Sequence, residues 1–129
     1  MMTVKNLIPK SKHDLAAVKN LQKADPASIT PILDQLFEWT EDGNWPVARP
    51  MADFLAAHGK LIVPLVRRVL NGNDLSYKYF CLDLVVRQLP AEAFSCLIQD
   101  LERLADNPTS EEIEEGLPEL ISEMTFARP

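Results

Sequence analysis

Apolar side chains recur at helical spacing along almost the whole chain, and short polar turns separate one apolar run from the next. The run at residues 28–40 is the clearest, with apolar side chains at Ile29, Ile32, Leu33, Leu36 and Phe37. This i, i+3, i+4, i+7, i+8 spacing is typical of one face of an amphipathic helix. Only four glycines accompany ten prolines, a balance that favours helices with sharp ends over a many-turned β fold. We therefore expect an all-α protein.

The periodicity predicts about six or seven helices, at residues 12–23, 28–40, 46–58, 61–70, 75–89, 90–106 and from 110 onwards. The run at 75–89 is apolar almost all round, so this helix should be central. Thr109 precedes Glu112 by three residues, which predicts a capping box at the start of the last helix. Gly116 and Pro118 predict a kink or a split within it.

A chain of 129 residues is expected to form one domain, spanning 1–129. Its core is large enough to fold without disulfides or metals. Cys81 and Cys96 lie inside apolar helical patterns and match no CxxC motif, which predicts two buried free thiols. No segment reaches about 18 uninterrupted apolar residues, and the N-terminus has no long apolar region. We therefore expect a soluble, cytoplasmic protein that does not bind membranes.

The net charge of −6 is unevenly distributed. Residues 1–91 carry 11 basic and 9 acidic side chains, whereas residues 92–129 carry 2 basic and 10 acidic ones. Phosphate binding needs clustered lysine and arginine, so this distribution argues against nucleic-acid binding. An acidic flank can attract a basic partner by long-range steering, or it can simply keep a helix face solvated.

The segment NWPVARP, between the second and third predicted helices, is unlike an ordinary surface helix. Gly43 is expected to supply the left-handed residue that ends the preceding helix. Asn44 should then cap the next helix, with Pro46 at its first position. Pro50 fits this scheme poorly, because its ring crowds the preceding turn. Either the regular helix begins nearer Arg49, or its first turn is distorted.

The helices also follow a repeating pattern. Pro31 and Pro64 lie near the start of two helices 33 residues apart, and the helices that follow them begin at intervals of about 31 to 33 residues. Each unit reads as a helix, a short polar turn and a second helix. Such units cannot bury their apolar faces alone, so they are expected to stack.

Two resemblances follow from these segments. The sequence WPVARPMADFL at 45–55 resembles the second helix of a HEAT-type repeat. Four segments, NLIPK, NWPVA, YKYFCL and NPTSEE, together resemble a family of small bacterial proteins known as domain of unknown function 5071. The resemblance implies an α-α superhelix of HEAT-like helical hairpins, and it supplies no catalytic residues.

HEAT-like scaffolds align successive second helices along one surface, so the resemblance implies that residues from separate units approach each other there. Tryptophan, tyrosine and arginine dominate the energetics of protein interfaces, which makes this surface a candidate binding site. Arg49 and Asp53 lie four residues apart and are expected to pair. The candidate partner-binding residues are Trp39, Asp42, Asn44, Trp45, Arg49, Asp53, Tyr77 and Lys78.

No nucleophile, phosphate-loop or metalloprotease motif occurs in the chain. His58 is expected to cap a helix end rather than to act as a base. We therefore expect a protein without catalytic residues, metal or cofactor, which binds another protein. An immunity protein that neutralises a basic bacterial toxin is one such function, with the acidic C-terminal region as the electrostatic partner.

Two other functions compete with this interpretation. Some HEAT-like folds bind nucleic acid through lysine and arginine on one face. The basic residues available for such a face are Arg67, Arg68, Lys78 and Arg87, which are few and balanced by acid. A metal-dependent hydrolase would instead use Glu38, Asp42 and Asp53, since carboxylates hold divalent ions. Helix-end polarity around a turn also explains these acidic residues.

Overall fold

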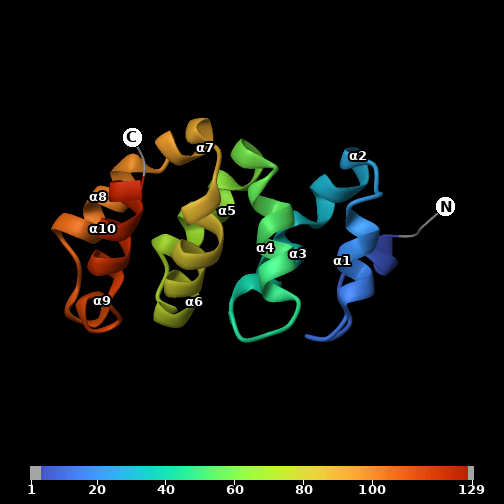
Figure 1. Cartoon of the computed structure of the whole chain (residues 1–129), viewed down its shortest axis with the longest axis horizontal. Coiled ribbons are helices and arrows are strands. Elements are labelled where there is room, and N and C mark those ends of the chain that lie inside the picture. Colours follow the sequence, from blue (N-terminus) through green and yellow to red (C-terminus); the bar gives the residue numbers. More distant parts are fainter. Residues whose placement is uncertain (1–3, 128–129) are drawn as a thin grey trace.

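Short helices joined by turns make up the protein in the computed structural model, which describes residues 4–127 and contains no strand in that range. This confirms the all-α prediction. The helices follow one another in chain order along the long axis, with the two chain ends at opposite sides (Figure 1). The elements are η1 (Val4–Leu7), α1 (Leu15–Leu21), α2 (Pro26–Ile29), η2 (Thr30–Ile32), α3 (Leu33–Phe37), η3 (Glu38–Thr40), α4 (Ala48–Ala56), η4 (Gly59–Ile62), α5 (Val63–Leu70), α6 (Leu75–Phe80), η5 (Cys81–Val85), η6 (Val86–Gln88), α7 (Ala91–Ser95), α8 (Ile98–Asp106), α9 (Ser110–Glu114) and α10 (Leu117–Ala127).

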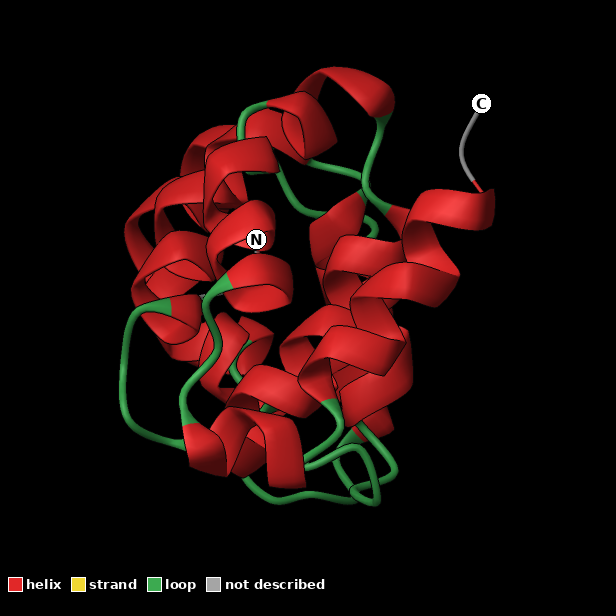
Figure 2. Ribbon diagram, turned by 90° about the vertical axis from the view of Figure 1, so that its left-hand side faces the viewer, coloured by secondary structure: helices red, strands yellow, loops and turns green. Residues whose placement is uncertain are grey.

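The helices form two layers when the molecule is seen along its long axis (Figure 2). In one layer α4 contacts α1 on one side and η5 on the other, and η5 contacts α10. We call this row, α1, α4, α6–η5–η6 and α10, the front layer, because it faces the viewer in Figure 1. In the second layer α3, α5 and α8 pack against α4, α6 and α10 respectively.

Prolines divide the helices more finely than the periodicity predicts. The helix expected at 28–40 consists of α2, η2, α3 and η3. Pro31 has no N–H to donate, and the chain around it tightens into a 3₁₀ turn. Pro64 stands in the first turn of α5, directly after the 3₁₀ segment η4. The apolar side chains still point inward, so the pattern correctly identified the buried face but not the continuity of the helix.

The stretch from Leu75 to Leu89 is central, as its all-round apolar character predicts. Within it η5 is a π-helical segment, and η6 is a 3₁₀ turn. Its buried residues are Cys81, Leu82, Leu84, Val85, Val86 and Leu89. The π-helical turn contains one residue more than an α-helical turn. The sequence positions that face the front of the molecule are therefore shifted by one residue between the two halves of this helix.

Polar contacts between neighbouring helices recur at a nearly constant sequence separation. The hydrogen-bonded pairs Arg67–Asp100, Lys78–Glu112, Gln88–Asp53 and Arg87–Glu123 are 33, 34, 35 and 36 residues apart. These intervals are close to the spacing of 31 to 33 residues expected from the sequence. Residues about 33 to 36 positions apart in the sequence are thus adjacent in space at these four places.

The start of α9 carries the predicted capping box. Thr109 Oγ1 accepts from the Glu112 N–H, and a Glu112 carboxylate oxygen accepts from the Thr109 N–H. The predicted split also occurs, since α9 ends at Glu114 and α10 begins at Leu117. Gly116 has a φ of +83° there, a left-handed conformation that glycine adopts without strain.

The two cysteines differ, in contrast to the prediction. Cys81 is fully buried in η5, and burial raises the pKa of its thiol above the usual range. Cys96 is exposed, so its predicted burial is wrong. It lies just beyond α7, where Ala93, Phe94 and Leu97 form the buried stripe and Cys96 faces away from it.

A buried ion cluster connects the second half of the stack. Lys78 and Glu112 are 5% and 1% exposed, and Lys78 Nζ donates to Glu112 Oε2 over 2.7 Å. Arg103, which is partly exposed, donates from both terminal nitrogens to the same carboxylate at 3.0 and 2.9 Å. Arg103 and Lys78 hold the pKa of Glu112 well below its usual range. The carboxylate therefore fixes α6, α8 and α9 relative to one another.

No helix among the described residues is both long and apolar enough to cross a membrane.

Replacing Glu112 by alanine should destabilise the protein by about 3 kcal/mol, because the Lys78 ammonium would stay buried without a counter-ion. Urea unfolding of the wild type and the variant measures this loss. Glu111→Ala is the matched control, since Glu111 is the exposed neighbour on the same short helix. Its cost should stay within about 0.5 kcal/mol. Equal losses in the two variants would contradict the role assigned to the cluster.

The same cluster predicts an acid-sensitive stability. The folded-state pKa of Glu112 lies below its unfolded value, so the folded state is stabilised above a pH of about 4.5 and loses this contribution as pH falls below it. One such group changes the free energy of unfolding by up to about 1.4 kcal/mol per pH unit. Glu112→Gln cannot titrate, so its stability should fall less steeply than that of the wild type between pH 5 and pH 3. Parallel curves from denaturant unfolding would refute this.

Candidate functional site

The corner before α4 differs from the predicted scheme in its capping. Regular helix begins at Ala48 with Val47 as its N-cap, so Asn44 is not the cap and Pro46 is not the first helical residue. Pro50 becomes the third residue of the helix, where a backbone N–H would have no intrahelical acceptor. Of the two alternatives for Pro50, a helix that begins near Arg49 is therefore correct.

Asp42 and Asn44 shape the turn that leads into this corner. Asp42 Oδ1 accepts from the Asn44 N–H over 2.9 Å, and the Asp42 carbonyl accepts from the Trp45 N–H. The expected left-handed conformation of Gly43 is wrong, since only Gly59 and Gly116 have positive φ in the described chain. A Cβ on Gly43 would lie 2.5 Å from the ring of Phe80. A larger side chain does not fit at position 43, because Phe80 of the central helix packs directly against this turn.

Trp39 and Trp45 lie against each other at the corner. Their ring centroids are 5.6 Å apart with the planes inclined at 58°, and both side chains are half-buried against the core. Val47 N–H also donates to the Lys12 carbonyl, which joins the corner to the segment before α1. Most of the two indole surfaces is therefore used in packing, and their rims face solvent.

Tyr77 and Lys78 point into the molecule rather than toward Arg49 and Asp53. The Tyr77 hydroxyl donates to the Phe37 carbonyl over 3.0 Å, and burial raises the pKa of this phenol above its usual range. Lys78 belongs to the buried cluster with Glu112. These contacts hold both side chains between the layers of helices. The structure thus does not bring these two predicted site residues to a common surface with Arg49 and Asp53.

The carboxylates near the corner form a loose group. Partial burial, followed by the charges of Asp74, Glu38 and Asp42, raises the pKa of Glu41. Asp53 is not among the charges that act on Glu41. In the part of the chain that the structure describes, no three histidine, cysteine or carboxylate side chains are placed to hold a metal ion.

His58 lies at the end of α4, as predicted. Its Nδ1 is 3.0 Å from the Phe54 carbonyl, which can only accept, so Nδ1 donates to a carbonyl of the last turn. The imidazole also lies against the Phe54 ring, with centroids 4.6 Å apart. The prediction that His58 caps a helix end is confirmed.

Three adjoining hollows follow the front layer and form what we call the front groove. The first, between α1 and α4, has a volume of about 450 Å³ and is lined by Pro50, Phe54, Ala57 and His58 with Gln22 and Asp53. The second, between α4 and the η5–η6 segment, measures about 280 Å³ and shares Asp53 with the first. The third, between η5 and α10, measures about 340 Å³ and shares Asp83 and Arg87 with the second. The shared residues show that the three hollows are neighbours along the front layer, with α4 and the central helix between them.

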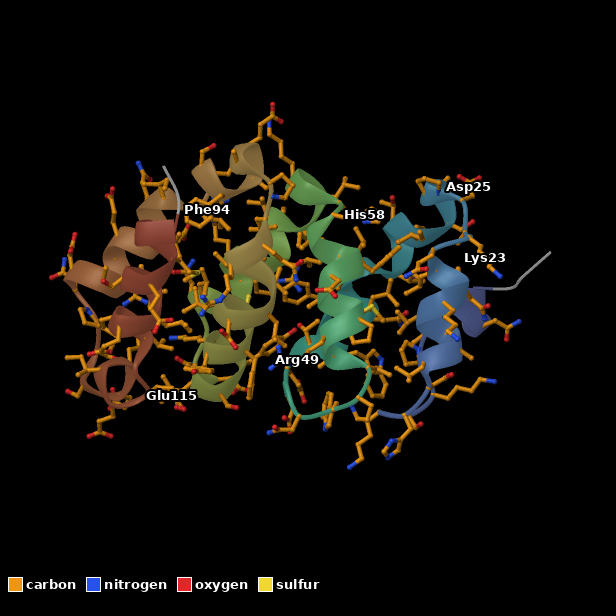
Figure 3. The ribbon with its side chains drawn as sticks, in the orientation of Figure 1. Lys23, Asp25, Arg49, His58, Phe94 and Glu115 are labelled. Carbon is orange, nitrogen blue, oxygen red and sulfur yellow. The ribbon has the colours of Figure 1, made fainter. Side chains whose placement is uncertain are left out.

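The charge of the front groove is predominantly negative. Five carboxylates line its three hollows, at Asp53, Asp83, Glu115, Glu119 and Glu123. Two arginines, Arg49 and Arg87, oppose them. Figure 3 shows Arg49 near the start of α4, His58 beyond its other end, and Glu115 at the far end of the molecule.

The polar contacts within the groove differ from the one that was predicted. Asp53 accepts from Gln88 Nε2 over 2.7 Å, and the expected ion pair between Arg49 and Asp53 does not occur among the described residues. Arg87 instead bridges Asp83 and Glu123. The sequence did contain a signal for these residues, because Asp53, Gln88 and Glu123 follow one another at intervals of 35 positions.

A larger hollow of about 560 Å³ lies between α6, α8 and the start of α9. Its charged lining consists of Lys78, Arg103 and Glu112, which bind one another, together with Glu111. Because the two positive and two negative groups sum to zero, this hollow offers less net charge to a ligand than the front groove does.

The family model described as "Domain of unknown function (DUF5071)" matches residues 7–125, nearly the whole chain. No curated protein matches the chain.

The inward position of Tyr77 leads to a stability prediction. Tyr77→Phe removes the donor to the Phe37 carbonyl and should cost about 1 kcal/mol of unfolding free energy. Tyr79→Phe is the matched control, because Tyr79 is also half-buried, packs edge-on against Phe80 and lacks this bond. Chemical denaturation of both variants measures the difference. A loss for Tyr79→Phe as large as that for Tyr77→Phe would contradict this account.

Proposed function

Since the chain belongs to the family described as domain of unknown function DUF5071, and that description states no activity, we propose a function from the front groove itself. The protein is a non-enzymatic binding domain whose front groove holds an extended, basic segment of another protein. No cofactor or metal takes part. The observation that carries this proposal is the line of three neighbouring hollows between α1, α4, the central helix and α10, with carboxylates concentrated at its C-terminal end.

The stacking of the helices supports an extended ligand. We propose that the two layers form an α-α superhelix of HEAT-like hairpins, in line with polar contacts that recur every 33 to 36 residues. Surfaces of stacked repeats are long and rigid, which suits peptides and protein faces. Neighbouring packed helices are about 8–10 Å apart, and an extended chain advances about 3.3 Å per residue. Every third residue of the ligand would then reach the next hollow.

The two ends of the groove differ in chemistry. Pro50, Phe54 and Ala57 make the first hollow largely apolar, so an apolar side chain of the partner fits there. Asp53 and Asp83 line the second hollow. Glu119 and Glu123 line the third. Carboxylates bind arginine and lysine through charge-assisted hydrogen bonds. The partner segment is thus apolar at one end and basic toward the other.

The negative charge of the front groove also attracts the partner before the two proteins touch. A cleft lined by one sign of charge steers an oppositely charged partner toward it, and this effect weakens as salt increases. The acidic C-terminal region contributes Glu115, Glu119 and Glu123 to the groove. Such an arrangement suits an immunity protein that covers a basic toxin, which is the specific form of the function that we favour.

The test uses a fluorescein-labelled peptide with leucine at one end and arginine at every third position, with glycine and serine between them. Fluorescence anisotropy at low salt should show binding by the wild type and none for a peptide with glutamate in place of arginine. The double variant Asp53→Asn/Glu119→Gln removes two groove charges and should weaken binding about fivefold.

The control for this experiment removes the same charge elsewhere. The control is the double variant Glu102→Gln/Asp106→Asn. Both residues lie on α8, and neither lines any of the three hollows. This variant should leave the dissociation constant within about twofold of the wild-type value, because only long-range attraction changes. Equal weakening by both double variants would mean that the peptide responds to net charge alone, and the groove would not be the binding site.

A further inference from the structure

We propose that Arg87 occupies the basic-side-chain site of the front groove in the free protein, and that an arginine or lysine of the partner must displace it. This inference rests on the proposed function of the groove. It assigns Arg87 a specific role, that of an internal competitor which determines how well a basic side chain of the partner binds.

The position of Arg87 supports this role. Arg87 Nη2 lies 2.8 Å from Asp83 Oδ1 and 3.3 Å from Glu123 Oε2. Asp83 belongs to the π-helical segment η5 and Glu123 to α10, so the guanidinium joins two neighbouring helices of the front layer. Arg87 and Asp83 line both the second and the third hollow. The guanidinium therefore stands where a basic group of the ligand would meet the carboxylates of both hollows.

The exposure of these groups makes displacement feasible. The side chains of Arg87, Asp83 and Glu123 are 41%, 26% and 65% exposed. Ion pairs with this exposure contribute little to stability, because water and salt screen them. An incoming guanidinium can make the same charge-assisted bonds with the carboxylates, including two parallel ones. The exchange therefore replaces one arginine by another without leaving a buried charge unpaired.

Arg49 is the control for Arg87, because it is a second arginine in the same groove. It lines the second hollow with Arg87, and it is exposed at the start of α4. Among the residues that the structure describes, no carboxylate lies within ion-pairing distance of Arg49. Removal of either arginine changes the charge of the groove equally. Only the removal of Arg87 releases two carboxylates.

The experiment compares Arg87→Met with Arg49→Met in the anisotropy assay, using the same arginine peptide. Arg87→Met should bind about tenfold more tightly than the wild type, because no competitor remains on Asp83 and Glu123. Arg49→Met should gain only about twofold, from the change in net charge. Arg87→Gln provides a second variant, which keeps a polar side chain but cannot form the ion pairs, and it should behave like Arg87→Met.

The outcomes separate this inference from the proposed function. Equal gains for Arg87→Met and Arg49→Met would overturn the role of Arg87 as a competitor, while peptide binding in the groove would stand. Weaker binding by both Arg87 variants, each with a wild-type melting temperature, would also overturn it, since Arg87 would then contact the peptide itself. If the wild type and all variants failed to bind, the proposed function would be wrong, and this inference with it.

Discussion

The buried carboxylate of Glu112 is the interaction on which the second half of the molecule depends. It accepts bonds from Lys78 on the central helix, from Arg103 on α8 and from the backbone of Thr109 before α9. A buried carboxylate is stable only when its oxygens are well paired, which favours one arrangement of these groups. Because α10 follows α9 after two residues and packs against α8, this arrangement also helps to place α10 beside η5. The acidic end of the front groove is therefore a consequence of a cluster that does not line it.

The sequence predicted the general character of the fold well, for a physical reason. Helical spacing of apolar residues reports which face is buried, and this face is correct at 28–40, while the run at 75–89 that is apolar almost all round is central, as expected. The capping box at Thr109 and the break at Gly116 were also predictable, since both depend on residues close in sequence. Prolines and the π-helical turn divide the helices further, and that division depends on tertiary packing that a single periodic pattern does not contain.

The candidate site was predicted less completely. Arg49 and Asp53 do line the front groove, whereas Tyr77 and Lys78 are held inside by Phe37 and Glu112. A tyrosine or lysine in a sequence gives no indication of a partner about 34 or 40 positions away, so both appeared available for binding. The groove residues that were missed, Asp83, Arg87 and Glu123, lie 30, 34 and 70 positions beyond Asp53. Their relation becomes visible only when the stacking register is known.

The π-helical segment η5 determines how the central helix responds to a change in its length. Each residue of a regular helix turns the chain by about 100°. Loss of one residue from a regular helix therefore rotates all later side chains by about that angle. Loss of one residue between Cys81 and Val85 would instead remove the residue that the π-helical turn holds in excess, and would restore α-helical geometry without that rotation. Arg87 and Gln88 would then stay at the front of the molecule. A single-codon deletion within η5 would thus preserve the groove, whereas the same deletion in the regular helix α4 before Asp53 would turn Asp53 away from it.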